Sequence, residues 1–226
     1  MFAVIFEVQP KKERFDDYLN FAKTLKPELE KIDGFIDNER FGSKRTEGRL
    51  LSLSTWRDEK AVIRWRTQSM HHAVQEKGRF EVFADYHLRV GEIVADNECP
   101  KDQTLQELRF DETEVGKAKA VTISELSHPS SGKSAGEGLS SEFGFQSYLM
   151  DGIIDHEIFE SITNQGKMLL LISWRDAKAA TNWQPGKIAE STPRHRLVRV
   201  IRDYGMDDRR EAPQYYPSVE PINRPV

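Results

Sequence analysis

Cysteine and long apolar runs are what this chain of 226 residues has least of. Cys99 is its only cysteine, so the chain forms no internal disulfide, and a reducing, cytoplasmic setting is expected. No apolar run is long enough to cross a bilayer. The opening MFAVIFEVQ is apolar but lacks the basic start and the cleavage site of a signal peptide, which favours a first strand.

Basic charge and metal-binding patterns are lacking as well. The formal net charge is −4, which gives no basic surface suited to nucleic acid. The sequence has no H-E-x-x-H motif, no cysteine pair and no histidine pair spaced to share a helix face, so no metal site is expected. Glycine-rich phosphate motifs are also missing. These absences argue against nucleic acids, metal ions and dinucleotides as partners.

What the sequence does contain is an internal repeat with a constant shift of 118 positions. The period is far too long for a solenoid unit, so we expect two domains, each with its own core. The shift maps Glu7, Gly34, Ile36, Asp37, Glu39, Phe41, Leu51, Leu53, Trp56, Arg57, Asp58, Lys60, Ala61 and Trp65 onto Glu125, Gly152, Ile154, Asp155, Glu157, Phe159, Leu169, Leu171, Trp174, Arg175, Asp176, Lys178, Ala179 and Trp183.

Each copy has the order strand, helix, strand, strand, helix, strand. Period-two alternation predicts the strands, three- and four-residue apolar spacing predicts the helices, Gly34 closes the first helix and Asp58 caps the second. This βαββαβ order predicts an α+β fold of tandem ferredoxin-like units. In the first copy we expect strands over 2–8, 35–41, 50–56 and 86–94, helical stretches over 15–32 and 69–85, and between them a helix that carries Ala61, Val62 and Trp65.

The second copy is degraded in its helices. Residues 128–138 are rich in serine, glycine and proline, so the first helical region is expected to be a loop. Matching Leu88 to Leu197 indicates that about nine residues are missing before the last strand, expected over 197–201. The predicted organisation is a first domain over 1–96, a linker over 97–116, a degenerate second domain over 117–205 and an extended tail over 206–226.

Four sequence features together carry a family resemblance. They are Trp56-Arg57-Asp58 at a strand end, Trp65 on the next helix, the stretch from His72 to Arg79, and the strand beginning Tyr86-His87-Leu88-Arg89-Val90. This pattern resembles the antibiotic biosynthesis monooxygenase family over nearly all of residues 1–96, and more weakly over 117–205. The resemblance implies the dimeric α/β barrel, which a tandem chain would form within itself. Whether the whole chain pairs again into a homo-oligomer stays open.

The resemblance also implies an activity. Members of the family include cofactor-independent monooxygenases that oxidise small or medium (hydroxy)aromatic substrates with O2. Two alternatives remain: a non-catalytic, stress-associated barrel that binds a ligand, and a haem-binding or haem-degrading relative. Haem-degrading relatives carry an Asn on the first strand and a ligand His ten residues beyond the helix Trp. Here Asn38 is on the second strand and position 75 is Gln, so no cofactor is expected, although His72 could still ligate haem.

Candidate site residues lie in the first copy. His72 is the expected base, because an imidazole titrates near neutrality, although His71 and His72 point in different directions from their helix. Arg89 and Tyr86 are expected to polarise a developing oxyanion. A barrel-interface ion pair is an equally good interpretation of Arg89, and a core edge of Tyr86.

Three further residues are expected to line the substrate pocket: Trp65, Asn38 and Arg40. Trp65 recurs in the second copy, which also suits a purely structural role in packing the helix onto the sheet. The His72 region is kept only in the first copy, so one working pocket is expected, in the N-terminal half.

Overall fold

The computed structural model describes residues 1–127, 143, 145, 150–186 and 192–213. The expected loop over 128–138 lies outside the described residues, as does the tail beyond residue 213. Among the described residues, no helix is both long enough and apolar enough to span a membrane.

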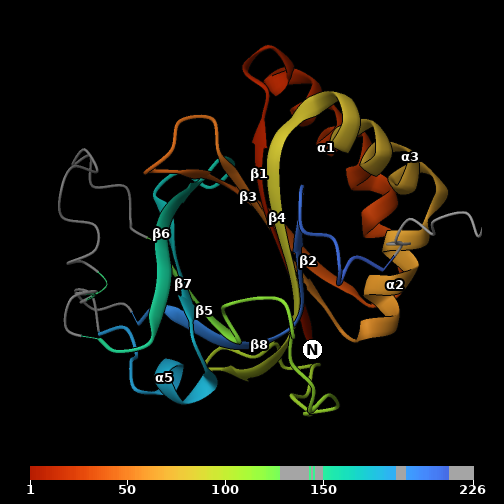
Figure 1. Cartoon of the computed structure of the whole chain (residues 1–226). Helices are drawn as coiled ribbons and strands as arrows, with labels where there is room; N and C mark the ends of the chain where they lie inside the picture. The colour runs from red at the N-terminus through yellow and green to blue at the C-terminus, as the bar shows by residue number, and fades with distance from the viewer. Residues whose placement is uncertain (128–142, 144, 146–149, 187–191, 214–226) are drawn as a thin grey trace, which may run out of the picture.

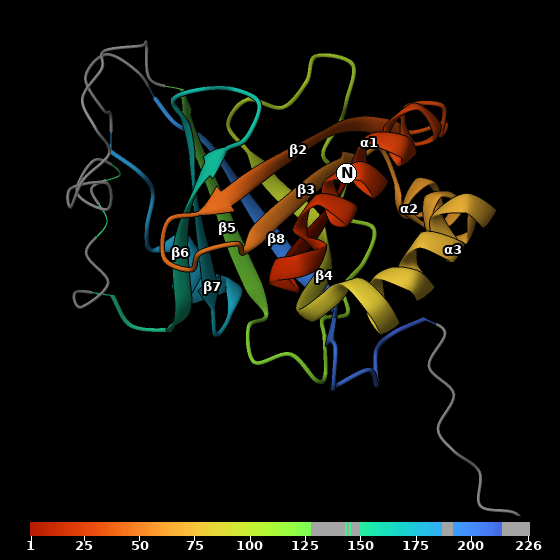
Figure 2. The same cartoon turned by 90° about the horizontal axis from the view of Figure 1, so that it is seen from above.

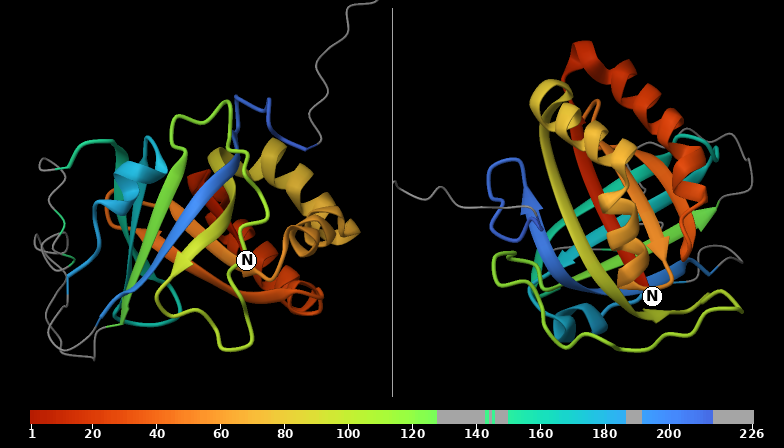
Figure 3. Two further views of the ribbon diagram at one scale, coloured as in Figure 1. Left: turned by 90° about the horizontal axis from the view of Figure 1, so that it is seen from below. Right: turned by 90° about the vertical axis from the view of Figure 1, so that its right-hand side faces the viewer.

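The first half has four strands with three helices on their outer side (Figures 1 and 3). The Asp58 carboxylate accepts a hydrogen bond from the Ala61 backbone N–H at 2.8 Å and caps α2, as predicted. The elements are β1 (Phe2–Pro10), α1 (Phe15–Glu30), β2 (Phe35–Ser43), β3 (Leu50–Trp56), α2 (Glu59–Thr67), α3 (Ser69–Lys77) and β4 (Phe83–Asp96), with short helical turns at Lys12–Arg14 and Gly78–Val82.

The helical stretch predicted over 69–85 is shorter in the structure. Helix α3 ends at Lys77, a π-helical turn follows, and strand β4 already begins at Phe83. A Cβ atom at position 78 would lie only 2.6 Å from the Phe83 ring, so Gly78 lets the chain fold back closely onto that ring. The predicted helical stretch was therefore wrong only for its last three residues, which belong to strand β4.

The second half repeats the strands and keeps little of the helices. Its only described helix, α5 (Ala177–Thr181), has five residues and is capped by the Asp176 carboxylate at 2.7 Å from the Ala179 N–H. This agrees with the predicted loss of helix in the second copy. The strands are β5 (Ala120–Ser127), β6 (Ile153–Ser161), β7 (Lys167–Trp174) and β8 (Arg194–Gly205).

All eight strands form one closed antiparallel barrel in the order β1-β3-β2-β6-β7-β5-β8-β4. The two halves have the same internal order, and they meet where β4 pairs with β8 and where β2 pairs with β6 (Figure 2). Closure gives each described strand two neighbours, although the β2–β6 pairing covers only Phe41–Ser43 of β2. The predicted barrel built from two ferredoxin-like units within one chain is thereby confirmed.

The halves share one core inside the barrel. Ile5 and Phe41 pack there with their counterparts Ile123 and Phe159, and all four side chains are fully buried. Burying such side chains contributes about 1.5–3 kcal/mol each. The expectation of a separate core for each copy is therefore incomplete: each half has an apolar cluster on its outer side, and the two halves share the one inside the barrel.

The expected linker over 97–116 is held against the barrel. Cys99 and Leu105 pack on the barrel core. The fully buried Glu92 carboxylate accepts backbone hydrogen bonds from Leu108 at 2.8 Å and Arg109 at 3.1 Å. The connection is thus part of the packed structure.

Strand register corrects the alignment of the last strands. Ile5 lies opposite Arg89, and its counterpart Ile123 lies opposite Arg196. Arg196 is therefore the counterpart of Arg89, at a shift of 107 rather than 109. The match of Leu88 to Leu197 was wrong by two residues.

Candidate functional site

A cavity of about 370 Å³ lies between the three helices and the outer face of the first-half sheet. Helices α1 and α2 turn apolar faces toward that sheet, and Figure 3 shows how they cover it. Most of the wall is apolar, with Val4 and Phe6 from β1 and Leu25 from α1 among its members. Such a space suits a small organic molecule.

Five of the six residues proposed from the sequence line this one cavity: Trp65, His72, Tyr86, Asn38 and Arg40. They come from α2, α3, β4 and β2, so the fold gathers them from four elements. Their chemical roles stay predictions.

Trp65 and His71 form one wall of the cavity. Their rings are stacked, with centroids 4.1 Å apart and an interplanar angle of 14°. His71 Nδ1 lies 2.9 Å from the Trp65 carbonyl oxygen, which can only accept, so Nδ1 carries the proton and donates it. Burial lowers the pKa of His71 to about 4. At neutral pH the ring is therefore uncharged, and its Nε2 keeps a free lone pair able to take a proton.

His72 also lines the cavity, but its side chain is exposed. The helix break at Gln68 sets this difference, because the Gln68 side chain caps α3 by accepting the His71 N–H at 2.7 Å. The cap brings the His71 ring onto Trp65 and leaves His72 toward solvent. Of the two adjacent histidines, His71 has the more enclosed position.

Polar groups on β2 and β3 form the floor of the cavity. The Asn38 amide donates to Ser52 Oγ and to the Leu53 carbonyl, both at 3.0 Å, which leaves its oxygen as an acceptor. The positive charge of Arg40 acts on the buried Tyr18 hydroxyl and opposes the rise of its pKa on burial. The buried Arg40 Nε has no hydrogen-bond partner. This part of the floor offers a cation to a group that would develop negative charge.

The C-terminal half completes the cavity of the N-terminal half. Arg202 and Tyr204 from β8, and Arg209 after it, reach the cavity from the second copy. Arg209 donates a hydrogen bond to the Tyr86 hydroxyl. Burial raises the pKa of Tyr86, so this hydroxyl stays protonated at neutral pH. The prediction that a single copy supplies the pocket is thus incomplete.

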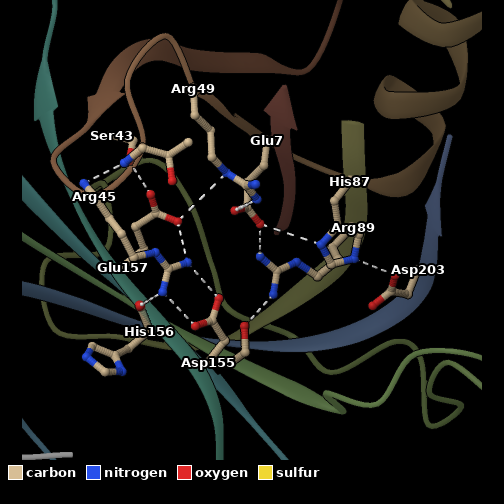
Figure 4. A network of polar contacts seen from close by, with 12 residues as sticks. Glu7, Ser43, Arg45, Arg49, His87, Arg89, Asp155, His156, Glu157 and Asp203 are labelled. Carbon is tan, nitrogen blue, oxygen red and sulfur yellow. Dashed lines mark hydrogen bonds and ion pairs between the residues drawn. The ribbon is translucent and has the colours of Figure 1, made fainter. Parts of the chain in front are cut away.

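Arg89 does not line the cavity. Its side chain is 2 % exposed and lies inside the barrel, where it forms an ion pair with Glu7 and donates to Ser173 Oγ at 2.6 Å (Figure 4). The prediction that Arg89 polarises a substrate oxyanion is therefore wrong. Its alternative interpretation, an ion pair at the barrel interface, is closer to the observed arrangement: the ion pair with Glu7 stays within the first half, and the hydrogen bond to Ser173 crosses to the second.

The same arrangement occurs a second time in the barrel. Arg196 pairs with Glu125 and donates to Thr55 Oγ1 at 3.2 Å. Each arginine thus holds a glutamate of its own half and a hydroxyl of the other half. This explains why the glutamate of the first strand recurs in the repeat.

A second pair of ion clusters joins the halves near the β2–β6 seam. Glu157 accepts from Arg45 at 2.8 Å and from Ser43 (Figure 4). Its counterpart Glu39 accepts from Lys167 and from Ser161 Oγ, each at 2.5 Å. The repeated acidic residues are therefore structural.

The outer face of the second half is filled. Phe145 packs against Trp183 with ring centroids 5.5 Å apart, and Phe143 is fully buried beside them. A surface hollow does lie beside α5, but its Arg175 is paired with Asp151 and Asp176, both at 3.2 Å. The equivalent trio in the first half, Arg57 with Asp33 and Asp58, is paired too, so this hollow follows from the repeated turn.

Sequence reasoning missed His71 as the enclosed histidine, and it missed the residues that the second copy contributes. The sequence did contain a signal for the polar floor of the cavity. Ser52 and Ser54 of the first copy correspond to Leu170 and Ile172, so the outward positions are polar in one copy and apolar in the other. Among the described residues, no group of three or more His, Cys, Asp or Glu side chains could hold a metal ion.

Comparison with known proteins agrees with this geometry. Residues 1–77 match the family model described as antibiotic biosynthesis monooxygenase. The chain is 43 % identical over 222 residues to a protein of Pyricularia oryzae named jasmonate monooxygenase ABM, covering 96 % of this chain and 99 % of that one. A crystal structure of aldoxime dehydratase shares the fold, with a TM-score of 0.54 at 9 % identity, over 88 % of this chain and 79 % of the other.

A relative of this identity, matched over nearly its whole length, places the activity in the same class, with a small molecule and O2 as substrates. The chain belongs to the antibiotic biosynthesis monooxygenase family.

Proposed function

We propose that the cavity is the active site of a cofactor-independent monooxygenase that oxidises a small or medium (hydroxy)aromatic substrate. The observation that carries this proposal is the neutral His71 ring, stacked on Trp65 inside a largely apolar cavity. A neutral imidazole has a free lone pair that can accept the proton of a substrate, and the hydrogen bond from Nδ1–H to the Trp65 carbonyl oxygen favours the charged ring that results. The resulting anion is electron-rich enough to react with O2 directly.

Each residue has a role in this reaction. His71 Nε2 takes a proton from an activated CH2 group, and Trp65 holds the aromatic ring in place. Arg40 takes the role first given to Arg89 and stabilises the negative charge that develops on the substrate oxygen, with the Tyr86 hydroxyl as a second donor. The carbanion adds O2 to give a hydroperoxide, which loses water to leave a carbonyl. One CH2 group and one O2 yield one C=O group and one water, so no external reductant is needed.

The test is oxygen uptake by the purified protein with a panel of hydroquinones and anthrones. His71→Ala should lower kcat by about 100- to 10,000-fold, the usual contribution of a general base. His72→Ala is the matched control, one residue away on the same helix, and should keep most of the activity. Loss of activity in His72→Ala alone would return the role of base to His72. Saturable binding of these compounds without any oxygen uptake would favour the non-catalytic barrel.

The pH profile tests the assignment of the base to His71 independently. Because the folded His71 has a pKa of about 4, the base stays unprotonated as the pH falls to 5. We therefore expect kcat/KM to be flat between pH 7 and 5 and to decline as the pH approaches 4. A decline centred near 6.5, the ordinary value for imidazole, would contradict the assignment to His71.

Jasmonate is the second substrate candidate, because the Pyricularia oryzae relative is named for it. The assay therefore includes jasmonate, with and without NADPH. Hydroxylation of an unactivated carbon consumes two electrons from a reductant, so uptake that depends on NADPH would contradict the cofactor-independent mechanism. Uptake without a reductant would support it.

Haem is the alternative cofactor, and the residue at the expected position of its ligand fits it poorly. Gln75, at the position where relatives that degrade haem place their ligand histidine, lines the cavity, and an amide is not a usual haem ligand. Adding haemin to the protein and recording its absorption spectrum tests this. A Soret band that shifts and saturates at one equivalent would contradict the proposal.

A further inference from the structure

The charge of the cavity is opposite to that of the chain. Six cationic and two acidic side chains line it, whereas the whole chain has a net charge of −4. One of the two acidic groups, Glu59, already accepts a hydrogen bond from Arg109 at 2.6 Å outside the cavity. The cationic residues are Lys26, Arg40, Arg66, Arg79, Arg202 and Arg209.

The five arginines of this lining lack acidic partners. Among the described residues, none of them forms an ion pair, whereas Lys26 has Glu30 at 3.8 Å. The Nε atom of Arg66, like that of Arg40, is buried without a hydrogen-bond partner. A buried guanidinium donor left unpaired costs free energy, which a bound acceptor would recover.

Four of the arginines act on two tyrosines of the cavity lining. The charges of Arg66, Arg202 and Arg209 act on the Tyr204 hydroxyl, and those of Arg79 and Arg209 act on Tyr86. We call Arg66, Arg79, Arg202 and Arg209 the arginine cluster. Its members come from α2, from the turn after α3, from β8 and from the segment after β8.

Like charges in one enclosed space repel each other, and the low dielectric of a cavity strengthens that repulsion. An anion among them removes the repulsion and supplies the missing acceptors. Guanidinium groups suit a carboxylate best, because their paired N–H groups match its two oxygens. The apolar remainder of the cavity, with Phe6 and Leu25, would take the hydrocarbon part of such a ligand.

We propose that the arginine cluster binds the carboxylate of an amphipathic substrate and directs its apolar part toward Trp65 and His71. This inference rests on the proposed function and adds the substrate class. The charge of Arg40 acts on Tyr18 and not on these two tyrosines, so recognition and chemistry use different cations. Arg66 is a positioning residue in this scheme.

The test compares two probes of equal chain length, decanoate and decanol, by isothermal titration calorimetry on the full chain. We expect decanoate to bind at least tenfold more tightly than decanol, and to lose this advantage as salt is raised. Arg66→Gln should weaken decanoate binding by about 10- to 100-fold and leave decanol unchanged. Arg202→Gln should act in the same direction, which guards against a folding defect in one variant.

Arg64→Gln is the matched control. Arg64 is two residues away on α2, half-exposed, and lies 3.5 Å from Asp33 outside the cavity. Its replacement should leave both affinities unchanged. Equal binding of decanoate and decanol to the native protein would overturn the proposal, as would an equal effect of Arg64→Gln and Arg66→Gln.

The two proposals fail in different ways. Binding of decanoate that depends on Arg66, with no oxygen uptake on any substrate, would leave the carboxylate site standing and contradict the monooxygenase mechanism. Oxygen uptake that depends on His71, with decanoate and decanol bound equally, would contradict the carboxylate site alone. A lower KM for carboxylic acids than for their methyl esters, with that difference lost in Arg66→Gln, would support both.

Discussion

The outer faces of the two half-sheets differ, whereas their inner faces are alike. Inside the barrel the same apolar residues and the same acidic residues recur, because both halves build one core and both contribute to its ion pairs. On the outer face the first half turns polar groups toward a cavity, and the second half packs apolar groups under Phe143, Phe145 and Trp183. Asn38, Arg40, Ser52 and Ser54 thus correspond to His156, Ile158, Leu170 and Ile172. The inner face was constrained by the barrel, and the outer face was free to become a site in one half and a filled core in the other.

The largest expected effect tests the equivalence of the inner faces. Glu7→Gln removes the acidic partner of the buried Arg89, and Glu125→Gln does the same to Arg196. Each leaves an uncompensated buried charge, so each should lower the free energy of unfolding by about 3–5 kcal/mol. Urea unfolding followed by circular dichroism measures both.

Glu112→Gln serves as the control, since Glu112 is an exposed glutamate of the connection between the halves. It should change the free energy of unfolding by less than about 0.5 kcal/mol. A large loss in only one of the two buried variants would show that the halves contribute unequally to the barrel.

The next effect tests the difference between the outer faces. Trp183 is 6 % exposed in the filled core of the second half, so Trp183→Ala should cost about 3–5 kcal/mol of stability. Trp65 is only half-buried, because one side of it faces the cavity. Trp65→Ala should therefore cost less stability and more activity. Thermal unfolding measures the stability of both variants, and oxygen uptake measures their activity per folded molecule. A lower activity in Trp183→Ala than in Trp65→Ala would contradict this expectation.

Much of the fold could be predicted from the sequence, because the repeat is long and its strands alternate clearly. It was harder to predict which face of the sheet the Arg89 side chain points to. Alternation shows that Arg89 points away from Leu88 and Val90, but it does not show which of the two faces is covered by helices. Ile5, opposite Arg89 in the register, lies in the barrel core and decides the question.

The two histidines illustrate a second limit. Helical spacing gives the direction of a side chain only within one continuous helix, and the chain breaks at Gln68, where ψ is 129°. Trp65 lies before this break and His71 after it, so no spacing rule relates their directions. The contributions of Arg202 and Arg209 were invisible for another reason: only barrel closure brings the C-terminal strand beside the helices of the first half.

The smallest effect concerns a glycine that both halves keep. Gly34 and Gly152 have φ of +89° and +86°, and a Cβ would lie 2.7 Å from Ala61 Cβ and 2.5 Å from Ala179 Cβ. Alanine at either position should cost about 1–3 kcal/mol of stability, measured by urea unfolding, since backbone strain and a steric clash act together. The similar geometry predicts similar losses.

Activity should separate these two variants. Ala61 is in α2, which carries Trp65 and Arg66 on the cavity wall, whereas Ala179 is in α5, which lines no part of that cavity. Pushing α2 away from the sheet in Gly34→Ala displaces the wall, so kcat/KM should fall at a temperature where the variant is fully folded. Gly152→Ala should keep its kcat/KM at that temperature.

Adding Ala61→Gly to Gly34→Ala removes the clash but not the strained φ, so it should restore activity while part of the stability loss remains. Equal losses of activity in Gly34→Ala and Gly152→Ala would show that the second half, too, supports the site through its helix, and that the outer faces are less independent than their residues indicate.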